Sequence, residues 1–215
     1  MIRLVARRFA EYQLTGHLAE SAPACAAWLT GQSSYRHSQL SPGQLRLLDA
    51  VASAGFTAVR CGFPFNTSAL SVPYHREPIA AASARNAAQY VAARLDRRFQ
   101  RELTRHLQPL VDRTSRRLVL LCGSCGLELL AAAQPRLVVP AELRILAIAL
   151  GPVGRLLTQT NPRIRLHVIQ GTGDWISRLG CRCRPDLRVR AGHMAYLHSQ
   201  EVRAEVVRVS AAFLR

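Results

Sequence analysis

Residues 117–130, R-L-V-L-L-C-G-S-C-G-L-E-L-L, carry the clearest structural signal in the chain. An apolar run rich in Leu and Val stops at the small residues of 122–126 and resumes as a Leu- and Ala-rich run that favours helix. Because almost nothing separates the two runs, they predict a strand-to-helix turn too sharp for ordinary side chains. Ser124, at the apex of this turn, is expected to be held away from the backbone on both sides, within reach of a substrate.

Spacing favours Ser124 over Cys125 at the apex. Two residues on either side of Ser124 stand Cys122 and Gly126, which are both small, whereas an apex at Cys125 would place Leu127 at one of these positions. Leu is too bulky for the close strand–helix packing that follows such a turn. The alternative is a serine in a Gly-rich loop that only caps the helix or meets a phosphate.

Around this stretch, short apolar runs alternate with longer amphipathic runs. That alternation predicts an α/β fold, with a mostly parallel sheet and helices on both faces. We interpret residues 1–215 as a single domain, with edge strands as one interpretation of residues 1–23. Strands are predicted over 24–29, 56–61, 118–121, 143–150, 164–169 and 187–190, and helices over 42–54, 79–111, 126–133 and 199–214.

Charge, hydropathy and cysteine content indicate which partners and which cellular compartment to expect. All 29 basic residues are Arg, and the formal net charge of +16 favours acidic partners such as nucleic acid, anionic lipid or an acidic protein. A nucleic-acid-binding function is the less favoured interpretation because no recognition motif accompanies the charge. No apolar segment has the length of a membrane span or signal peptide, so we expect a cytoplasmic protein whose six cysteines are free.

Four of the cysteines could in principle be the ligands of one metal ion. Cys122 and Cys125 form a C-x-x-C pair, and Cys181 and Cys183 form a C-x-C pair. The first pair lies across the proposed turn and the second lacks the spacing usual for zinc. The interpretation without metal or other cofactor is therefore preferred.

A serine hydroxyl needs a base to remove its proton and an acid to orient that base. Asp174 lies in a Gly-containing loop after the predicted strand 164–169, and His193 follows the last predicted strand. Asp186 is a rival acid, but it stands at the start of a strand and so at the wrong end of the sheet. His167, inside a strand, is better explained as a packing residue, and His198 as part of the start of the last helix.

With Ser124, Asp174 and His193 in this order, the chain resembles the α/β-hydrolase superfamily over residues 24–215. The resemblance implies that Ser124 is the nucleophile, His193 the base and Asp174 the acid that holds the base. It also implies an oxyanion hole of two backbone N–H groups. These are the N–H of Cys125 and that of Gln32 or its neighbour Gly31.

The resemblance predicts a serine esterase or thioesterase that forms an acyl-enzyme. Residues 151–163 leave little room for a lid, so we expect a shallow site bordered by Phe63, Phe65 and Trp175. An open site on a basic protein would suit an acyl group carried by an acidic or phosphorylated carrier. The alternatives are an acyltransferase or cyclase, or a binding module that no longer hydrolyses.

Overall fold

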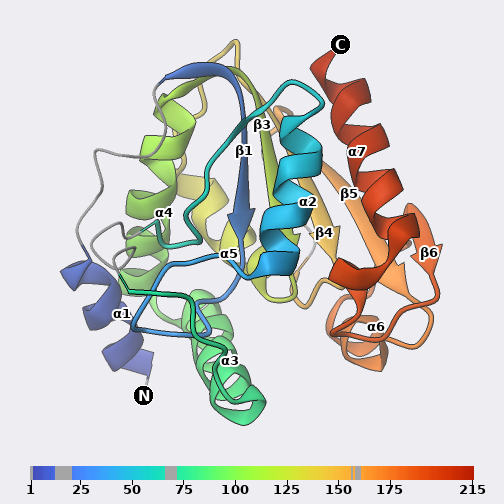
Figure 1. Cartoon of the computed structure of the whole chain (residues 1–215). Coiled ribbons are helices and arrows are strands. Elements are labelled where there is room, and N and C mark those ends of the chain that lie inside the picture. Colours follow the sequence, from blue (N-terminus) through green and yellow to red (C-terminus); the bar gives the residue numbers. More distant parts are fainter. Residues whose placement is uncertain (1, 13–20, 66–71, 156, 158–160) are drawn as a thin grey trace.

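The computed structural model describes residues 2–12, 21–65, 72–155, 157 and 161–215. In these parts of the chain, six strands form one sheet in the order β2-β1-β3-β4-β5-β6, and every neighbouring pair is parallel (Figure 1). The α/β fold class with a parallel sheet is thus confirmed. The strands are β1 (Ala22–Leu29), β2 (Thr57–Ala58), β3 (Thr114–Gly123), β4 (Arg144–Leu150), β5 (Ile164–Gly171) and β6 (Leu187–Val189).

Helices cover both faces of the sheet, because successive strand residues point to opposite sides. Leu118 and Leu120 of β3 pack into the core layer shared with α1 (Ile2–Glu11), α3 (Ile79–Leu95), α4 (Arg97–Asp112) and α5 (Gly126–Ala133). Val119 and Leu121 pack into the opposite layer, with α2 (Pro42–Ala52) and α7 (Gln200–Leu214). A short helix, α6 (Trp175–Gly180), lies at the end of the sheet to which the strand arrows point (Figure 1). No helix in the described ranges is long and apolar enough to cross a membrane.

The starts predicted for α2, α3, α5 and α7 lie within one residue of those observed. Ser41 caps α2 by accepting a hydrogen bond from the Gln44 N–H, while the Gln44 side chain accepts one from the Ser41 N–H. Ser199 caps α7 in the same way through the N–H of Val202. The bounds predicted for α5 match those observed.

The single helix predicted over 79–111 is wrong, because the chain breaks at Asp96. This residue has extended backbone dihedrals (φ −110°, ψ 107°), and its carboxylate accepts from the N–H groups of Arg98 and Phe99 to start α4. The break leaves Leu95 exposed, whereas Phe99 of α4 is buried. It also places Arg94 on α3, whereas Arg98, Arg101 and Arg105 lie on α4.

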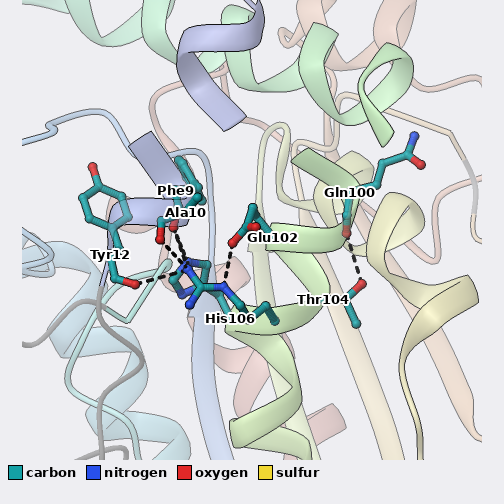
Figure 2. Close-up of polar contacts among 8 residues, drawn as sticks. Phe9, Ala10, Tyr12, Gln100, Glu102, Thr104 and His106 are labelled. Atoms are coloured by element: carbon teal, nitrogen blue, oxygen red, sulfur yellow. Dashed lines mark hydrogen bonds and ion pairs between the residues drawn. The ribbon is translucent and has the colours of Figure 1, made fainter. Parts of the chain in front are cut away.

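Edge strands were one interpretation of residues 1–23, of which residues 1 and 13–20 lie outside the described residues; in the described part, the only strand is the start of β1 at Ala22. Residues 2–11 form α1, which packs against α3 and α4. The C-terminal end of α1 is held by the Arg105 guanidinium, which donates to the carbonyls of Phe9, Ala10 and Tyr12 (Figure 2). A cation at this end satisfies carbonyls that have no partner within the helix. The predicted strand over 56–61 shrinks to β2 at the sheet edge.

Candidate active site

Ser124 stands at the apex of a strained turn between β3 and α5. Its φ of 49° is in the left-handed region, which residues other than glycine rarely occupy. Backbone hydrogen bonds hold the turn: the Ser124 N–H donates to the Leu150 carbonyl (3.1 Å), and the Val153 N–H donates to the Ser124 carbonyl (2.9 Å). A Cβ at Gly126 would lie 1.9 Å from the Leu29 carbonyl oxygen, so this position admits only glycine. The sharp turn expected from the sequence is therefore present.

The three residues singled out from the sequence meet at the carboxyl end of the sheet. The Ser124 Oγ lies 3.1 Å from His193 Nε2, and His193 Nδ1 lies 3.0 Å from each carboxylate oxygen of Asp174. The Asp174 side chain is fully buried, whereas the His193 side chain is 19 % exposed. A hydroxyl, an imidazole and a buried carboxylate in this order can deprotonate the hydroxyl and stabilise the resulting imidazolium.

Asp174 has two further hydrogen-bond donors. It is the N-cap of α6, where its Oδ1 accepts from the Ser177 N–H at 2.9 Å. Its Oδ2 accepts from the Tyr196 hydroxyl at 2.7 Å, and that hydroxyl accepts in turn from the Gly171 N–H at 2.7 Å. Burial, followed by the bond to Asp174, raises the pKa of Tyr196, so its hydroxyl stays protonated and able to donate.

Tyr196 was not found from the sequence, since no short motif marks a tyrosine that acts through another residue's carboxylate. A glycine makes room for it. Gly151 follows β4 with φ 53°, and a Cβ there would lie 2.5 Å from the Tyr196 ring and 2.8 Å from Asp174 Oδ2. Gly151, at the end of β4, thus packs directly against Asp174 and Tyr196.

The oxyanion hole implied by the resemblance needs correction at Gln32. Its N–H donates to the Gln89 Oε1 (2.8 Å), and its carbonyl accepts from the Gln89 Nε2 (2.9 Å). This buried pair satisfies both backbone groups, so the Gln32 N–H has an acceptor already. Gly31 lies against the Cys125 sulfur, since a Cβ at Gly31 would be 2.7 Å from that atom. Cys125 itself directly follows Ser124 as the N-cap of α5, where backbone N–H groups lack partners within the helix.

Phe63 and Phe65 do not border the site as expected. Both rings are buried and pack edge to face on one another, and Phe63 also contacts Phe9 of α1 and His106 of α4. They are core residues because α1, which the sequence did not reveal, covers this region. Trp175, by contrast, follows Asp174 directly and is 67 % exposed.

A buried carboxylate behind the turn was also missed. Glu128, one turn along α5 from Ser124, is fully buried, and Arg155 donates to it through its backbone N–H (2.9 Å) and its Nε (2.8 Å). Its third contact with Arg155 is an ion pair of 2.6 Å. A buried charge needs such partners. The pair joins α5 to the loop after β4.

The rival residues have structural roles. The Asp186 carboxylate accepts from the Val168 N–H (2.7 Å), and His167 lies 3.0 Å from Glu205 of α7. The cysteine pairs do not assemble into a metal site: among the described residues, no group of three or more His, Cys, Asp or Glu side chains could hold a metal ion. Burial raises the pKa of the Cys125 thiol to about 11, so it is a poor nucleophile beside Ser124.

Comparison with known proteins adds little to this geometry. No protein-family model matches the chain, and no curated protein does either. Among solved structures, the chain is similar to a dienelactone hydrolase from Anabaena variabilis, with a TM-score of 0.44 and 14 % sequence identity over 90 % of this chain and 86 % of that one. A likeness this distant carries no inference about activity. The strand–turn–helix around Ser124 and the Ser–Asp–His order, both present in the structure, agree with the resemblance to the α/β-hydrolase superfamily.

Proposed function

We propose that this protein is a serine hydrolase that cleaves carboxylic esters or thioesters through an acyl-enzyme on Ser124. The observation that carries the proposal is the continuous chain of contacts from the strained Ser124 hydroxyl through His193 to the buried Asp174. Each contact has a length suited to proton transfer or orientation. A serine in a loop that only caps a helix needs neither the positive φ nor the imidazole.

The reaction follows from these contacts. His193 Nε2 takes the Ser124 proton as Oγ attacks the acyl carbon, while Asp174 accepts from Nδ1–H and stabilises the imidazolium. The Cys125 N–H, with Gly31 as the candidate for a second donor, would stabilise the oxyanion. His193 then gives its proton to the leaving alcohol or thiol. Water, deprotonated by the same imidazole, releases the acid and restores Ser124.

Steady-state hydrolysis of a series of p-nitrophenyl esters and acyl thioesters tests the proposal. Ser124→Ala and His193→Ala are each expected to lower kcat by roughly 10³-fold or more, since removing either triad member abolishes nucleophile activation. Ser115→Ala, at an exposed position of β3, is the matched control and keeps full activity. Hydrolysis that survives in Ser124→Ala but is lost in Cys125→Ala would contradict the proposal.

A further inference from the structure

Helix α6 presents an apolar surface to solvent beside the triad. Its inner side is fixed by Ser177, which is fully buried and whose N–H donates to Asp174. Trp175 and Leu179, four residues apart, share the side opposite Ser177 and are 67 % and 72 % exposed, with the exposed Ile176 next to them. Large apolar side chains clustered in this way on a surface mark an interaction site.

Met194 is a further exposed apolar side chain next to the triad. It directly follows His193, as Trp175 follows Asp174, and His193 and Asp174 are 3.0 Å apart. Met194 is 72 % exposed. The two loops lie side by side, since a Cβ at Gly173 would be 3.4 Å from the Ala191 carbonyl oxygen. Exposed apolar side chains therefore flank the acid and the base of the triad.

The same segment is strongly basic. Residues 175–194 contain five arginines and one acidic residue, Asp186, a difference of +4. All five arginines are exposed, and none forms an ion pair with another residue that the structure describes. They are Arg178, Arg182, Arg184, Arg188 and Arg190.

We propose that this face binds an anionic lipid surface. The exposed side chains that would make this contact, named the α6 face, are Trp175, Ile176, Leu179, Met194 and the five arginines of 178–190. Aromatic and aliphatic side chains would enter the boundary between headgroups and acyl chains, while the arginines meet lipid phosphates. A nucleic acid would engage the arginines but leave the apolar side chains in water, whereas an anionic membrane engages both. The substrate class that follows, lipid-borne acyl esters delivered to Ser124, rests on the proposed hydrolase activity; the binding itself does not.

Vesicle co-sedimentation with the intact Ser124→Ala chain tests the binding apart from any hydrolysis. Binding is expected with vesicles of phosphatidylglycerol and phosphatidylcholine, and much less with phosphatidylcholine alone. The chain contains two tryptophans, and Trp28 is buried with its indole N–H bonded to the Gln44 carbonyl. A blue shift of tryptophan emission on vesicle addition therefore reports on Trp175.

Paired variants locate the binding surface. Leu179→Ser is expected to weaken binding about tenfold, from the burial energy of a leucine side chain. Arg182→Ser and Arg184→Ser are each expected to weaken it about fivefold. The controls are Val138→Ser, equally exposed but ahead of β4 at the opposite end of the sheet, and Arg97→Ser on α4. Both controls should bind as the parent does.

Absence of vesicle binding, or equal losses in the α6-face and control variants, would overturn the proposal. So would binding to DNA or to an acidic protein without binding to anionic vesicles. A chain that binds vesicles but shows no Ser124-dependent hydrolysis would leave the lipid-binding face standing and remove the proposed activity.

Discussion

Replacing Tyr196 by Phe tests whether the second donor to Asp174 matters. The change removes an O–H···carboxylate bond of 2.7 Å inside the protein, a type that contributes about 1.5–3 kcal/mol. It also removes the acceptor of the buried Gly171 N–H, which costs about 1–3 kcal/mol. Because one hydroxyl makes both bonds, the two costs overlap. We expect the free energy of unfolding to fall by about 3 kcal/mol.

The activity of Tyr196→Phe should change in a particular way. Asp174 keeps the Ser177 N–H and His193 as partners but loses one constraint on its position. Because Asp174 orients the base His193, a less firmly held Asp174 is expected to lower kcat by roughly tenfold. KM should stay nearly unchanged because Tyr196 is buried.

Urea unfolding and steady-state kinetics measure these two effects on the same preparation. Tyr74→Phe, which changes an exposed tyrosine, is the control and should alter neither quantity. A loss of less than about 1 kcal/mol in Tyr196→Phe, together with an unchanged kcat, would refute the role given to this hydroxyl.

Three further predictions concern the turn, a buried histidine and a thiol pair. Gly126→Ala would drive a methyl group into the Leu29 carbonyl, so little folded, active protein is expected by circular dichroism and esterase assay. Burial lowers the pKa of His106, so the unfolded state binds the extra proton; urea unfolding should show stability falling as pH drops below about 6.5, and less so in His106→Gln. A hydrogen bond from the Cys181 thiol, 3.4 Å away, lowers the pKa of Cys183, so Cys183 should be alkylated fastest at pH 7 and more slowly in Cys181→Ala.

Different results would contradict each of these. Wild-type stability in Gly126→Ala would mean that the strand and helix do not pack as closely as described. An identical pH dependence in His106→Gln would assign the acid sensitivity to other groups. Alkylation of Cys183 that does not depend on Cys181 would remove the effect of the thiol pair.

The triad could be predicted from the sequence because its signals are local. Ser124 lies where an apolar run meets small residues and then a helix-forming run; Asp174 follows a short apolar run, and His193 follows a short, more polar predicted strand. In a parallel sheet, loops that follow strands gather at one end, so three such positions converge without any knowledge of packing. The observed contacts among these residues agree with that reasoning.

What the sequence could not indicate depends on contacts between distant segments. Phe63 and Phe65 look like loop residues until α1 is placed over them, and α1 itself has no start signal of its own. The Gln32–Gln89 pair joins residues 57 apart in sequence, and so changes the oxyanion hole in a way that no loop motif encodes. The break at Asp96 was within reach, since an aspartate that caps a helix interrupts the pattern there.

Covalent labelling of Ser124 tests whether this serine is a nucleophile activated by His193. Wild-type protein treated with a fluorophosphonate should gain one adduct, and peptide mass spectrometry should place it on Ser124. The labelling rate should fall steeply in His193→Ala, because the imidazole 3.1 Å from Oγ activates the hydroxyl. The absence of an adduct, or an adduct on another residue, would show that Ser124 is not the nucleophile. Labelling of Ser124 at the same rate in His193→Ala would show that His193 is not its base.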